Sequence, residues 1–545
     1  GCGPDVSLGD CTRDNIAQNI HNLLVYVLSK CEDDTKTLFT IIKIYKALLL
    51  QFGVARAEFD VRWKSAHAVK RAMQNKLCHT KKHIRALLVE RIQLQHEMRV
   101  LDDRSCYMTE LQEVLIKDLF SLSTSVYTEV RIKAQKVLSS CFERFLYSAR
   151  FLMDSIIGKL KPDPGVSHEQ FKGSLHVLLN SRVLYLVTHY WEIIEKIWLA
   201  VAKAEHSEKP SIISLINLVT DKINKKYDAV AVSRTVSSSA VDSAMSLLNA
   251  VVSGYLPSSC ATPVIPSQDE ISGGEQALVV RNEANLCHYN SLVEKLISLV
   301  NGNELRWRFS QICVRFLSLL VRCDVDPPAC LVKLFTENLV HDSLAIRKGA
   351  ISSMGAVLKL QKRKHTKVLI DPYAEAGVSK TENGVIQAGD RQDNYWLHYV
   401  KENLPSSEED WNKCQFVDKT HWGYYTWPQK LFTYAPYSQQ PSLDRSRENL
   451  NETEQVVFDA FSNPEFVDKL ISYLSLEDRK GKDKFNVQRF VLFKGLFRNF
   501  GDTFLELFKS HLEKLAGDTH ESNQRCVAEI TAGLIRGSKH WTYQK

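Results

Sequence analysis

Histidines that lie beside a glutamate, or four residues from another histidine, are the first positions at which this sequence could support chemistry. His79 and His83 are spaced to share one helix face, and His96 and His520 each precede a glutamate. A zinc site needs three or four ligands, but no third ligand accompanies the first pair and no second histidine completes an H-E-x-x-H motif. Motifs for nucleotide binding or a serine nucleophile, such as G-x-x-x-x-G-K-[ST] and G-x-S-x-G, do not occur. We therefore expect no catalytic residues, no metal site and no required cofactor.

A run of basic residues offers a different kind of chemistry. Residues 62–99 contain ten Lys or Arg against Glu90 and Glu97, a net charge of +8 in a chain whose total is +7. Apolar residues at helical spacing accompany these cations, so the run is either the solvated face of a basic helix or an anion site. Lys81, Lys82 and Arg85 fall within about one helical turn, which could bring several charged donors to one polyphosphate. From the residues alone, both interpretations stay open.

Helices must position these side chains, because helical periodicity covers almost the whole chain. Residues 16–28 and 38–49 carry apolar side chains at helical spacing on either side of the polar hinge 31–36, which is typical of a helical hairpin. Convincing alternating strands are absent. The sequence therefore predicts an all-α fold. Further helical stripes occupy residues 108–120, 130–158, 168–204, 210–226, 284–322, 329–340, 346–360, 454–475, 485–499 and 503–516.

Composition is consistent with a folded protein in a reducing compartment. The chain has 545 residues, 44% of them hydrophobic and 24% charged, which is ordinary for a globular protein but too long for one compact core. Thirteen cysteines are scattered without a C-x-x-C pair, which favours the nucleus or cytosol over secretion. The longest uncharged stretch, residues 243–268, is interrupted by prolines, so we expect no membrane span.

Three segments resemble one another and indicate an internal repeat. Each places an arginine three residues before an alanine, just after a short hinge that follows an apolar helix. This spacing is typical of the second helix of a HEAT repeat, so we predict a HEAT-like α-α superhelix, with unrelated helical bundles as the alternative. Asp342 and Asp518 lie in two of the hinges and are expected beside the arginines. The repeat-motif residues are Arg131 and Ala134, Arg347 and Ala350, and Arg525 and Ala528.

Three regions interrupt the predicted repeats. Helical repeats are expected in residues 1–253, 279–362 and 451–545, with mobile loops at 254–278 and 363–395. Residues 396–450 form an irregular aromatic-rich segment, which either fastens a long loop onto neighbouring helices or presents a stacking surface to a peptide or single-stranded nucleic acid. Few basic residues are interleaved, so we do not expect nucleic-acid binding. Its aromatic residues are Trp422, Tyr424, Tyr425, Trp427, Phe432, Tyr434 and Tyr437.

Long, unusual strings in the same chain resemble a known family. VDKTHWGYYTWP (417–428), SLEDRKGKDKFN (475–486), FVLFKGLFRNF (490–500) and ESNQRCVAEITAGLIRGSKHW (521–541) are similar to the large single-chain HEAT-repeat proteasome activators. KCEDDTKTLFTIIKIYKALL (30–49) and LHVLLNSRVLYLVTHYWEIIEKIW (175–198) extend the resemblance to the first half. Since the chain starts without Met and ends just after a periodic apolar segment, we expect an internal piece of such a protein, truncated within its last repeats.

The resemblance implies a non-catalytic scaffold. Such activators form a helical dome that caps the end ring of the proteasome core particle, opens its gate without ATP and promotes degradation of peptides and proteins. It also implies acetylated histones as substrates, recognised through a region that we do not find in this sequence, roles in DNA repair and spermatogenesis, and a nuclear and cytosolic location. Inositol phosphates are associated with such domes, which makes them the expected ligand of Lys81, Lys82 and Arg85. The alternative is a generic HEAT adaptor or transport receptor that binds a protein partner.

Overall fold

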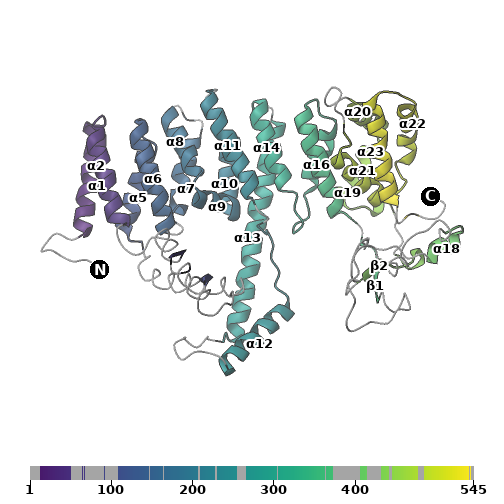
Figure 1. Ribbon diagram of the computed structural model, residues 1–545, viewed down its shortest axis with the longest axis horizontal. Coiled ribbons are helices and arrows are strands. Elements are labelled where there is room, and N and C mark those ends of the chain that lie inside the picture. Colours follow the sequence, from purple (N-terminus) through teal and green to yellow (C-terminus); the bar gives the residue numbers. More distant parts are fainter. Residues whose placement is uncertain are drawn as a thin grey trace, which may run out of the picture. The chain divides into compact units, whose positions relative to one another are not determined.

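The computed structural model is mostly helical in the part of the chain that it describes (Figure 1), which confirms the predicted all-α class. These residues fall into two compact units, Gly1–Phe316 and Leu317–Lys545. The structure describes residues 13–50, 64–65, 67, 91–92, 108–145, 148–161, 163, 165–205, 209–227, 230–254, 265–302, 305–362, 364–371, 405–413, 431–440, 445–476, 484–538 and 541.

In the first unit, helical hairpins stack so that like helices meet. Helix α1 packs against α5 and α2 packs against α6, while each hairpin also closes on itself. Stacking first helix on first helix and second on second is the arrangement of a helical solenoid. The helices are α1 (Arg13–Lys30), α2 (Thr35–Leu50), α5 (Glu110–Ser123), α6 (Thr128–Arg144), α7 (Met153–Leu160), α8 (His168–Leu178), α9 (Ser181–His189), α10 (Trp191–Ala202), α11 (Pro210–Lys226), α12 (Ser238–Gly254), α13 (Gln268–Asn301) and α14 (Trp307–Leu319), with a 3-10 turn at Arg150–Leu152 before α7.

The second unit repeats this arrangement. Helix α15 packs against α19, and the second layer runs from α16 through α21 to α23. Its elements are α15 (Ala329–Glu337), α16 (Leu344–Leu360), β1 (Lys367–Ile370), α18 (Glu408–Lys413), β2 (Leu431–Tyr434), α19 (Glu452–Phe461), α20 (Pro464–Leu474), α21 (Val487–Phe500), α22 (Leu505–Ala516) and α23 (Glu521–Gly537), with 3-10 turns at Asn338–Val340, Tyr437–Gln439 and Arg447–Asn449.

Large side chains fill the core of each unit. In the first, the fully buried Trp198 stacks on Phe316 with ring centroids 4.7 Å apart and donates its indole N–H to the carbonyl of Val187. In the second, Phe493 and Phe497 on α21 each meet Phe508 on α22 edge-on. Edge-to-face packing adds to the stabilisation that comes from burial alone.

A small antiparallel sheet corrects the expectation that strands are absent. Strand β1, inside the predicted loop 363–395, pairs with β2 in the aromatic-rich segment, from Lys367 opposite Tyr434 to Ile370 opposite Leu431. Each strand has four residues. Runs this short carry too little alternation to be distinguished from loop in a sequence.

Helix α13 corrects the predicted loop 254–278. Its 34 residues begin at Gln268, so the second part of that loop is helical. Ser267 caps the helix: its hydroxyl accepts from the N–H of Glu270, whose carboxylate accepts from the N–H of Ser267. This capping box starts the helix despite Gly273 and Gly274, which follow in the next turn. The structure does not test the other predicted segment boundaries.

Candidate interaction sites

The anion site that we predicted lies outside the described residues. Lys81, Lys82 and Arg85 are not among them, and only positions 64–65, 67 and 91–92 of the basic run are described. Their association with inositol phosphates therefore stays a prediction.

The first two repeat-motif arginines bind the backbone of their own hinges. Arg131, at the start of α6, donates from Nη1 to the carbonyls of Ser125 and Val126 at 2.7 and 2.8 Å. Arg347, at the start of α16, donates from Nη1 to the carbonyls of His341 and Asp342 at 2.6 and 2.8 Å. Each guanidinium thus supplies donors to a hinge whose carbonyls have no helical partner.

Of the two hinge aspartates, Asp342 lies beside its arginine as expected, but it meets Arg347 through its backbone carbonyl and not through its carboxylate. The carboxylate of Asp342 accepts from the hydroxyl of Tyr473 on α20 at 2.6 Å, and that ring lies 4.1 Å from the Arg347 guanidinium carbon. Asp518 accepts from the N–H of His520 and from the side chain of Asn523, not from Arg525. The hinge carbonyls, which the sequence pattern does not reveal, are the partners of the first two arginines.

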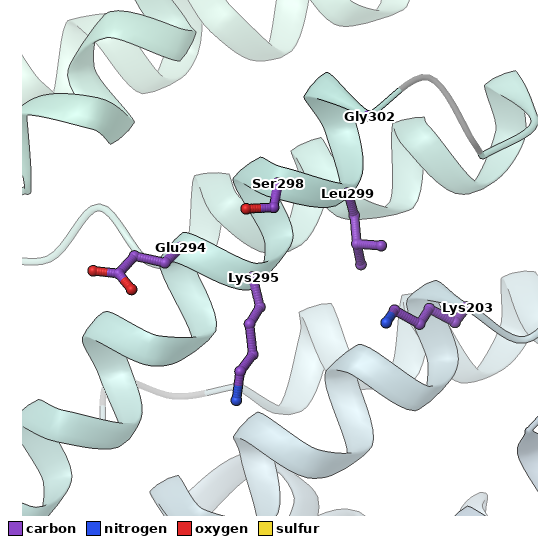
Figure 2. Close-up of a pocket in the computed structure, with 6 residues that line it drawn as sticks. All are labelled: Lys203, Glu294, Lys295, Ser298, Leu299 and Gly302. Atoms are coloured by element: carbon purple, nitrogen blue, oxygen red, sulfur yellow. The ribbon is translucent and has the colours of Figure 1, made fainter.

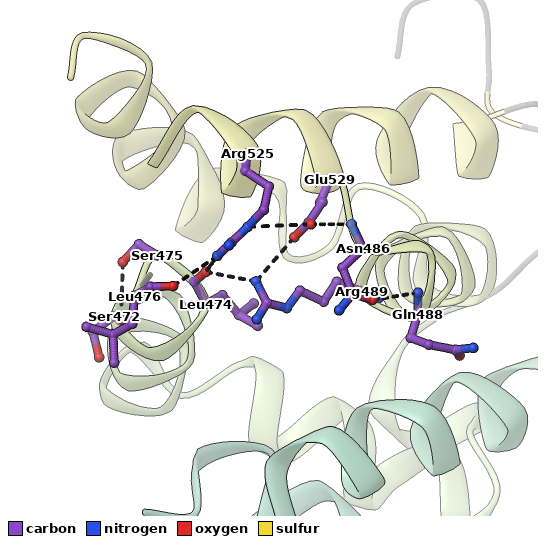
Figure 3. Close-up of polar contacts among 9 residues, drawn as sticks. All are labelled: Ser472, Leu474, Ser475, Leu476, Asn486, Gln488, Arg489, Arg525 and Glu529. Atoms are coloured by element: carbon purple, nitrogen blue, oxygen red, sulfur yellow. Dashed lines mark hydrogen bonds and ion pairs between the residues drawn. The ribbon is translucent and has the colours of Figure 1, made fainter. Parts of the chain in front are cut away.

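The third arginine takes part in a buried ionic network (Figure 3). Arg525 donates from Nη2 to the carbonyls of Leu474 and Leu476, at 2.7 and 3.0 Å, and so reaches the end of α20. Arg489 on α21 donates to the same Leu474 carbonyl at 3.1 Å. Glu529 lies 3.6 Å from both guanidinium groups and accepts from the N–H of Asn486 at 2.6 Å. The network thus ties α20, α21 and α23 together.

Burial dominates the electrostatics of this network. Glu529 is 1% exposed, and burial raises the pKa of its carboxyl against the opposing effects of the Asn486 N–H, Arg489 and Arg525. Removing one partner of a buried ion pair lowers the free energy of unfolding strongly, because the other charge stays buried without a partner. The network is therefore a structural joint. The sequence did not predict it, because Arg489 and Glu529 lie in helices that carry several other charged residues.

The alanines of the repeat motif do not behave alike. Ala134 and Ala350 are fully buried between helices. Ala528 is exposed. In the third segment, glycines allow the close approach instead: a Cβ on Gly533 would lie 2.6 Å from Cβ of Phe493, and one on Gly537 would lie 2.8 Å from Cβ of Phe497. Close approach of the helices in this segment thus depends on glycines five and nine residues after Ala528.

An open polar pocket lies between α10 and α13 in the first unit (Figure 2). Its volume is about 400 Å³, and Lys203 at the end of α10 faces Lys295 and Leu299 of α13 across it. Lys295 is neutralised by Glu195, with Nζ 2.7 Å from Oε1. The lining contains a serine and two lysines but neither His nor Cys, and among the described residues no hydrogen bond joins Ser298 to either lysine. Its lining residues are Lys203, Glu294, Lys295, Ser298, Leu299 and Gly302.

Glu195 joins α10 to one face of α13. It accepts from Ser291 at 2.6 Å and lies 2.6 Å from Nδ1 of His288, in addition to its contact with Lys295. Burial works to raise the pKa of Glu195, but the bonds from Lys295, Ser291 and His288 outweigh it and hold the pKa below its usual value. Serine and histidine both bind the carboxylate, which is not the geometry of a catalytic triad.

Part of the aromatic-rich segment is described. Tyr434 is buried on β2, where its ring meets His365 edge-on at 6.1 Å, while Phe432 and Tyr437 are partly exposed. This agrees with aromatic side chains that fasten an insertion to the fold. Trp422, Tyr424, Tyr425 and Trp427 lie outside the described residues, so the proposed stacking surface is not tested.

Within the described ranges, no group of three His, Cys, Asp or Glu residues could hold a metal ion. No helix among the residues placed by the structure is long and apolar enough to cross a membrane.

Comparisons with known proteins match both units. Residues 330–545 match the family described as proteasome activator complex subunit 4-like, HEAT repeat-like. Proteasome activator complex subunit 4 from Bos taurus is 46% identical over 541 residues, which cover 98% of this chain and 29% of the relative. The proteins of the same name from Homo sapiens and Xenopus laevis are 44% and 43% identical over the same shares.

The chain is a homologue of proteasome activator complex subunit 4. It spans 29% of the length of the curated relatives that it matches. The family match covers α15 to α23, including the helices that carry Arg347 and Arg525, and so confirms the HEAT-like fold that the repeat motif predicted. The relatives extend the similarity to the first unit.

Proposed function

We propose that this homologue of proteasome activator complex subunit 4 contributes a helical-repeat wall to an ATP-independent activator that caps the proteasome core particle and opens its gate. The observation that supports this most strongly is 44% identity to the human activator subunit over 98% of the chain. Helical repeats stacked layer on layer suit this role, because they build extended surfaces without a catalytic cleft.

The protein is a scaffold in this proposal, and the core particle cleaves the substrate. In the pocket between α10 and α13, no hydrogen bond of the described residues pairs Ser298 with a lysine, and the buried Glu529 network has no access to a substrate. By the same resemblance we propose acetylated histones as substrates, roles in DNA repair and spermatogenesis, and a nuclear and cytosolic location.

A chimera tests the proposal most directly. This chain would replace the matching stretch of the human activator subunit, and peptide hydrolysis by latent core particle would be measured. We expect stimulation close to that of the unaltered subunit, because equivalent repeats should support the same contacts. A control chimera with an unrelated HEAT array of equal length should not stimulate.

A generic HEAT adaptor is the competing function. In that case the chimera would fold, as judged by its helical circular dichroism and melting temperature, yet fail to bind or stimulate the core particle. That result would overturn the activator proposal.

A further inference from the structure

Three neighbouring helices of the second unit carry cations and very few acids. Helices α16 and α21 contain no Asp or Glu. Helix α23 contains Glu521 in its first turn and Glu529, which is buried against Arg489 and Arg525. The carboxyl-terminal halves of all three helices therefore present positive charge without compensating carboxylates on the same helices.

Close backbone contacts fix how these halves lie. A Cβ on Gly495 of α21 would lie 2.7 Å from Cβ of Leu358 on α16, and a Cβ on Gly355 would lie 3.2 Å from the side chain of Val491. Positions 355 and 358 thus face 491 and 495 in the same order, so α16 and α21 are parallel. Asn499 adds a hydrogen bond of 2.8 Å to the carbonyl of Leu358.

The same reasoning places α23 beside α21. Cβ atoms on Gly533 and Gly537 would lie 2.9 Å from the backbone nitrogen of Lys494 and 3.1 Å from that of Arg498, respectively. Helix α23 is therefore also parallel to α21, and the three carboxyl-terminal ends lie at one end of the layer.

This register brings four cations together, which we name the basic track: Lys359, Lys494, Arg498 and Arg536. Lys359 follows Leu358, Lys494 precedes Gly495 and Arg536 precedes Gly537, so the members lie at the glycine contacts. Lys359 and Arg536 are exposed, and Lys494 and Arg498 are half-buried. Among the described residues, no carboxylate lies within ion-pair distance of any of the four.

Gathering these charges has an energetic cost. Burial lowers the pKa of Lys494, and the charges of Arg536, Arg498 and Lys359 lower it further. Cations in a last helical turn are favoured by the helix dipole, which accounts for Lys359, Arg498 and Arg536. Lys494 lies before the last turn of α21 and gains no such benefit. An anionic ligand would offset the repulsion.

We propose that the basic track binds an extended acidic segment of a partner polypeptide. The cations follow a line across three helices whose axes lie about 8–10 Å apart, so the track spans roughly 16–20 Å. An extended peptide of about five or six residues covers that length. A compact polyphosphate would be better matched by donors that converge on one point. The proposal concerns binding by this chain and does not depend on proteasome activation.

Fluorescence polarisation of labelled hexaglutamate with the full chain would test the proposal. Lys81→Ala, Lys82→Ala and Arg85→Ala would be introduced as background, because the basic run could also attract this probe. We expect salt-sensitive binding that Lys359→Glu with Arg536→Glu weakens by at least about tenfold. Both positions are exposed, so the reversal should preserve the fold.

Lys509→Glu with Lys514→Glu on α22 is the matched control, since these lysines are also exposed and the charge change is equal. It should alter affinity by less than about twofold. If the control variant lost as much affinity for hexaglutamate as the basic-track variant, the basic track would be overturned as a site. Binding of tripolyphosphate without hexaglutamate, or binding that disappears in the background variant alone, would overturn the peptide proposal.

A second measurement separates ligand binding from a purely structural role. Lys494→Met keeps the apolar stem and removes a half-buried cation beside three others, so it should raise the melting temperature of the ligand-free protein and weaken hexaglutamate binding. A lower melting temperature with unchanged binding would contradict the proposal.

Discussion

Individual arginines hold the hinges by donating to carbonyl oxygens. In Arg347 the guanidinium binds two hinge carbonyls and lies against the Tyr473 ring. Because carbonyl oxygens do not titrate, these two hydrogen bonds do not depend on the protonation state of their acceptors. A planar fork suits two adjacent carbonyls better than the single ammonium of lysine does.

Arg347→Ala should therefore destabilise the second unit by about 2–4 kcal/mol, because two charge-assisted hydrogen bonds and a cation–π contact disappear. Arg347→Lys should recover only part of that loss. Thermal unfolding and amide exchange in residues 341–343 would measure both. Equal stability of the alanine variant and the unaltered chain would contradict this role.

Lys81, Lys82 and Arg85 carry a prediction of their own. If they form an inositol phosphate site, inositol hexakisphosphate should raise the melting temperature in a salt-sensitive way, since binding to the native state stabilises it by mass action. The triple alanine variant should lose the shift, and Lys359→Glu with Arg536→Glu should keep it. The opposite pattern would move the site to the basic track.

The sequence located the arginines but not their partners. Spacing identifies a residue at the start of a helix, whereas the partner depends on the conformation of the hinge, which spacing does not describe. For this reason the spacing placed Arg347 beside Asp342 but did not show that the contact is made through the Asp342 carbonyl. It also did not show that Asp518 bonds His520 and Asn523 instead of Arg525.

At the scale of elements, glycine contacts decide how closely the second-layer helices approach. A Cβ at position 533 would meet the Phe493 side chain at 2.6 Å and the Lys494 backbone nitrogen at 2.9 Å. Backbone atoms cannot move aside independently, so α21 and α23 would have to separate.

Gly533→Ala should therefore destabilise the second unit by about 1–3 kcal/mol, as overpacked cores do. Gly273→Ala in α13 is the matched control, because no atom lies within 4 Å of its added Cβ. The control should stabilise its helix by up to about 1 kcal/mol through helix propensity. Thermal unfolding of the two variants would show opposite shifts, and shifts of the same sign would refute the packing argument.

The hinge before α23 should respond to pH. Hydrogen bonds from the N–H and the ring of His520 lower the pKa of Asp518 to about 2, and Asp518 in turn raises the pKa of His520. Asp518 stabilises the folded state fully above its unfolded pKa of 3.8, and this stabilisation is lost as the pH falls toward 2. His520 stabilises the folded state fully below its unfolded pKa of 6.5, and this stabilisation is lost as the pH rises through the raised pKa of the folded state.

Asp518→Asn should therefore lower the melting temperature most between about pH 4 and 6.5, where both contributions are present. The difference from the unaltered chain should shrink toward pH 2 and again above neutrality. Melting curves across this range would measure it, and a difference that does not vary with pH would contradict the assignment.

Elements with strong periodicity were predictable, and those set by a few local contacts were not. The hairpin of α1 and α2 follows from apolar spacing over many residues. The start of α13 at Gln268 depends on one capping box, and the sheet of β1 and β2 depends on pairing across more than sixty residues. Non-local pairing leaves little trace in a short stretch of sequence.

At the scale of the whole molecule, the chain should hydrolyse no peptide of its own, because the nucleophile would belong to the core particle. Alone, it should also fail to stimulate latent core particle, since it spans 29% of the length of its curated relatives and a cap must contact much of the ring. Peptide hydrolysis with the chain or the human subunit at equal concentration would test both. Hydrolysis by the chain that proteasome inhibitors do not affect would overturn the first expectation, and equal stimulation the second.

Helix α13 has a mechanical consequence. Its buried side chains are Tyr289, Leu292, Val293 and Leu296, and Asn282 and Asn285 bond the backbone of Arg234 and Val232, so the described contacts hold the helix from position 282 onward. The fourteen helical residues 268–281 extend about 21 Å beyond these contacts. A tilt of about 10° at these contacts would therefore move the amino-terminal end of α13 by about 4 Å, and a force on that end would act on the bonds between Glu195 and α13. Helix α13 would therefore act as a lever that pivots where it packs against α10.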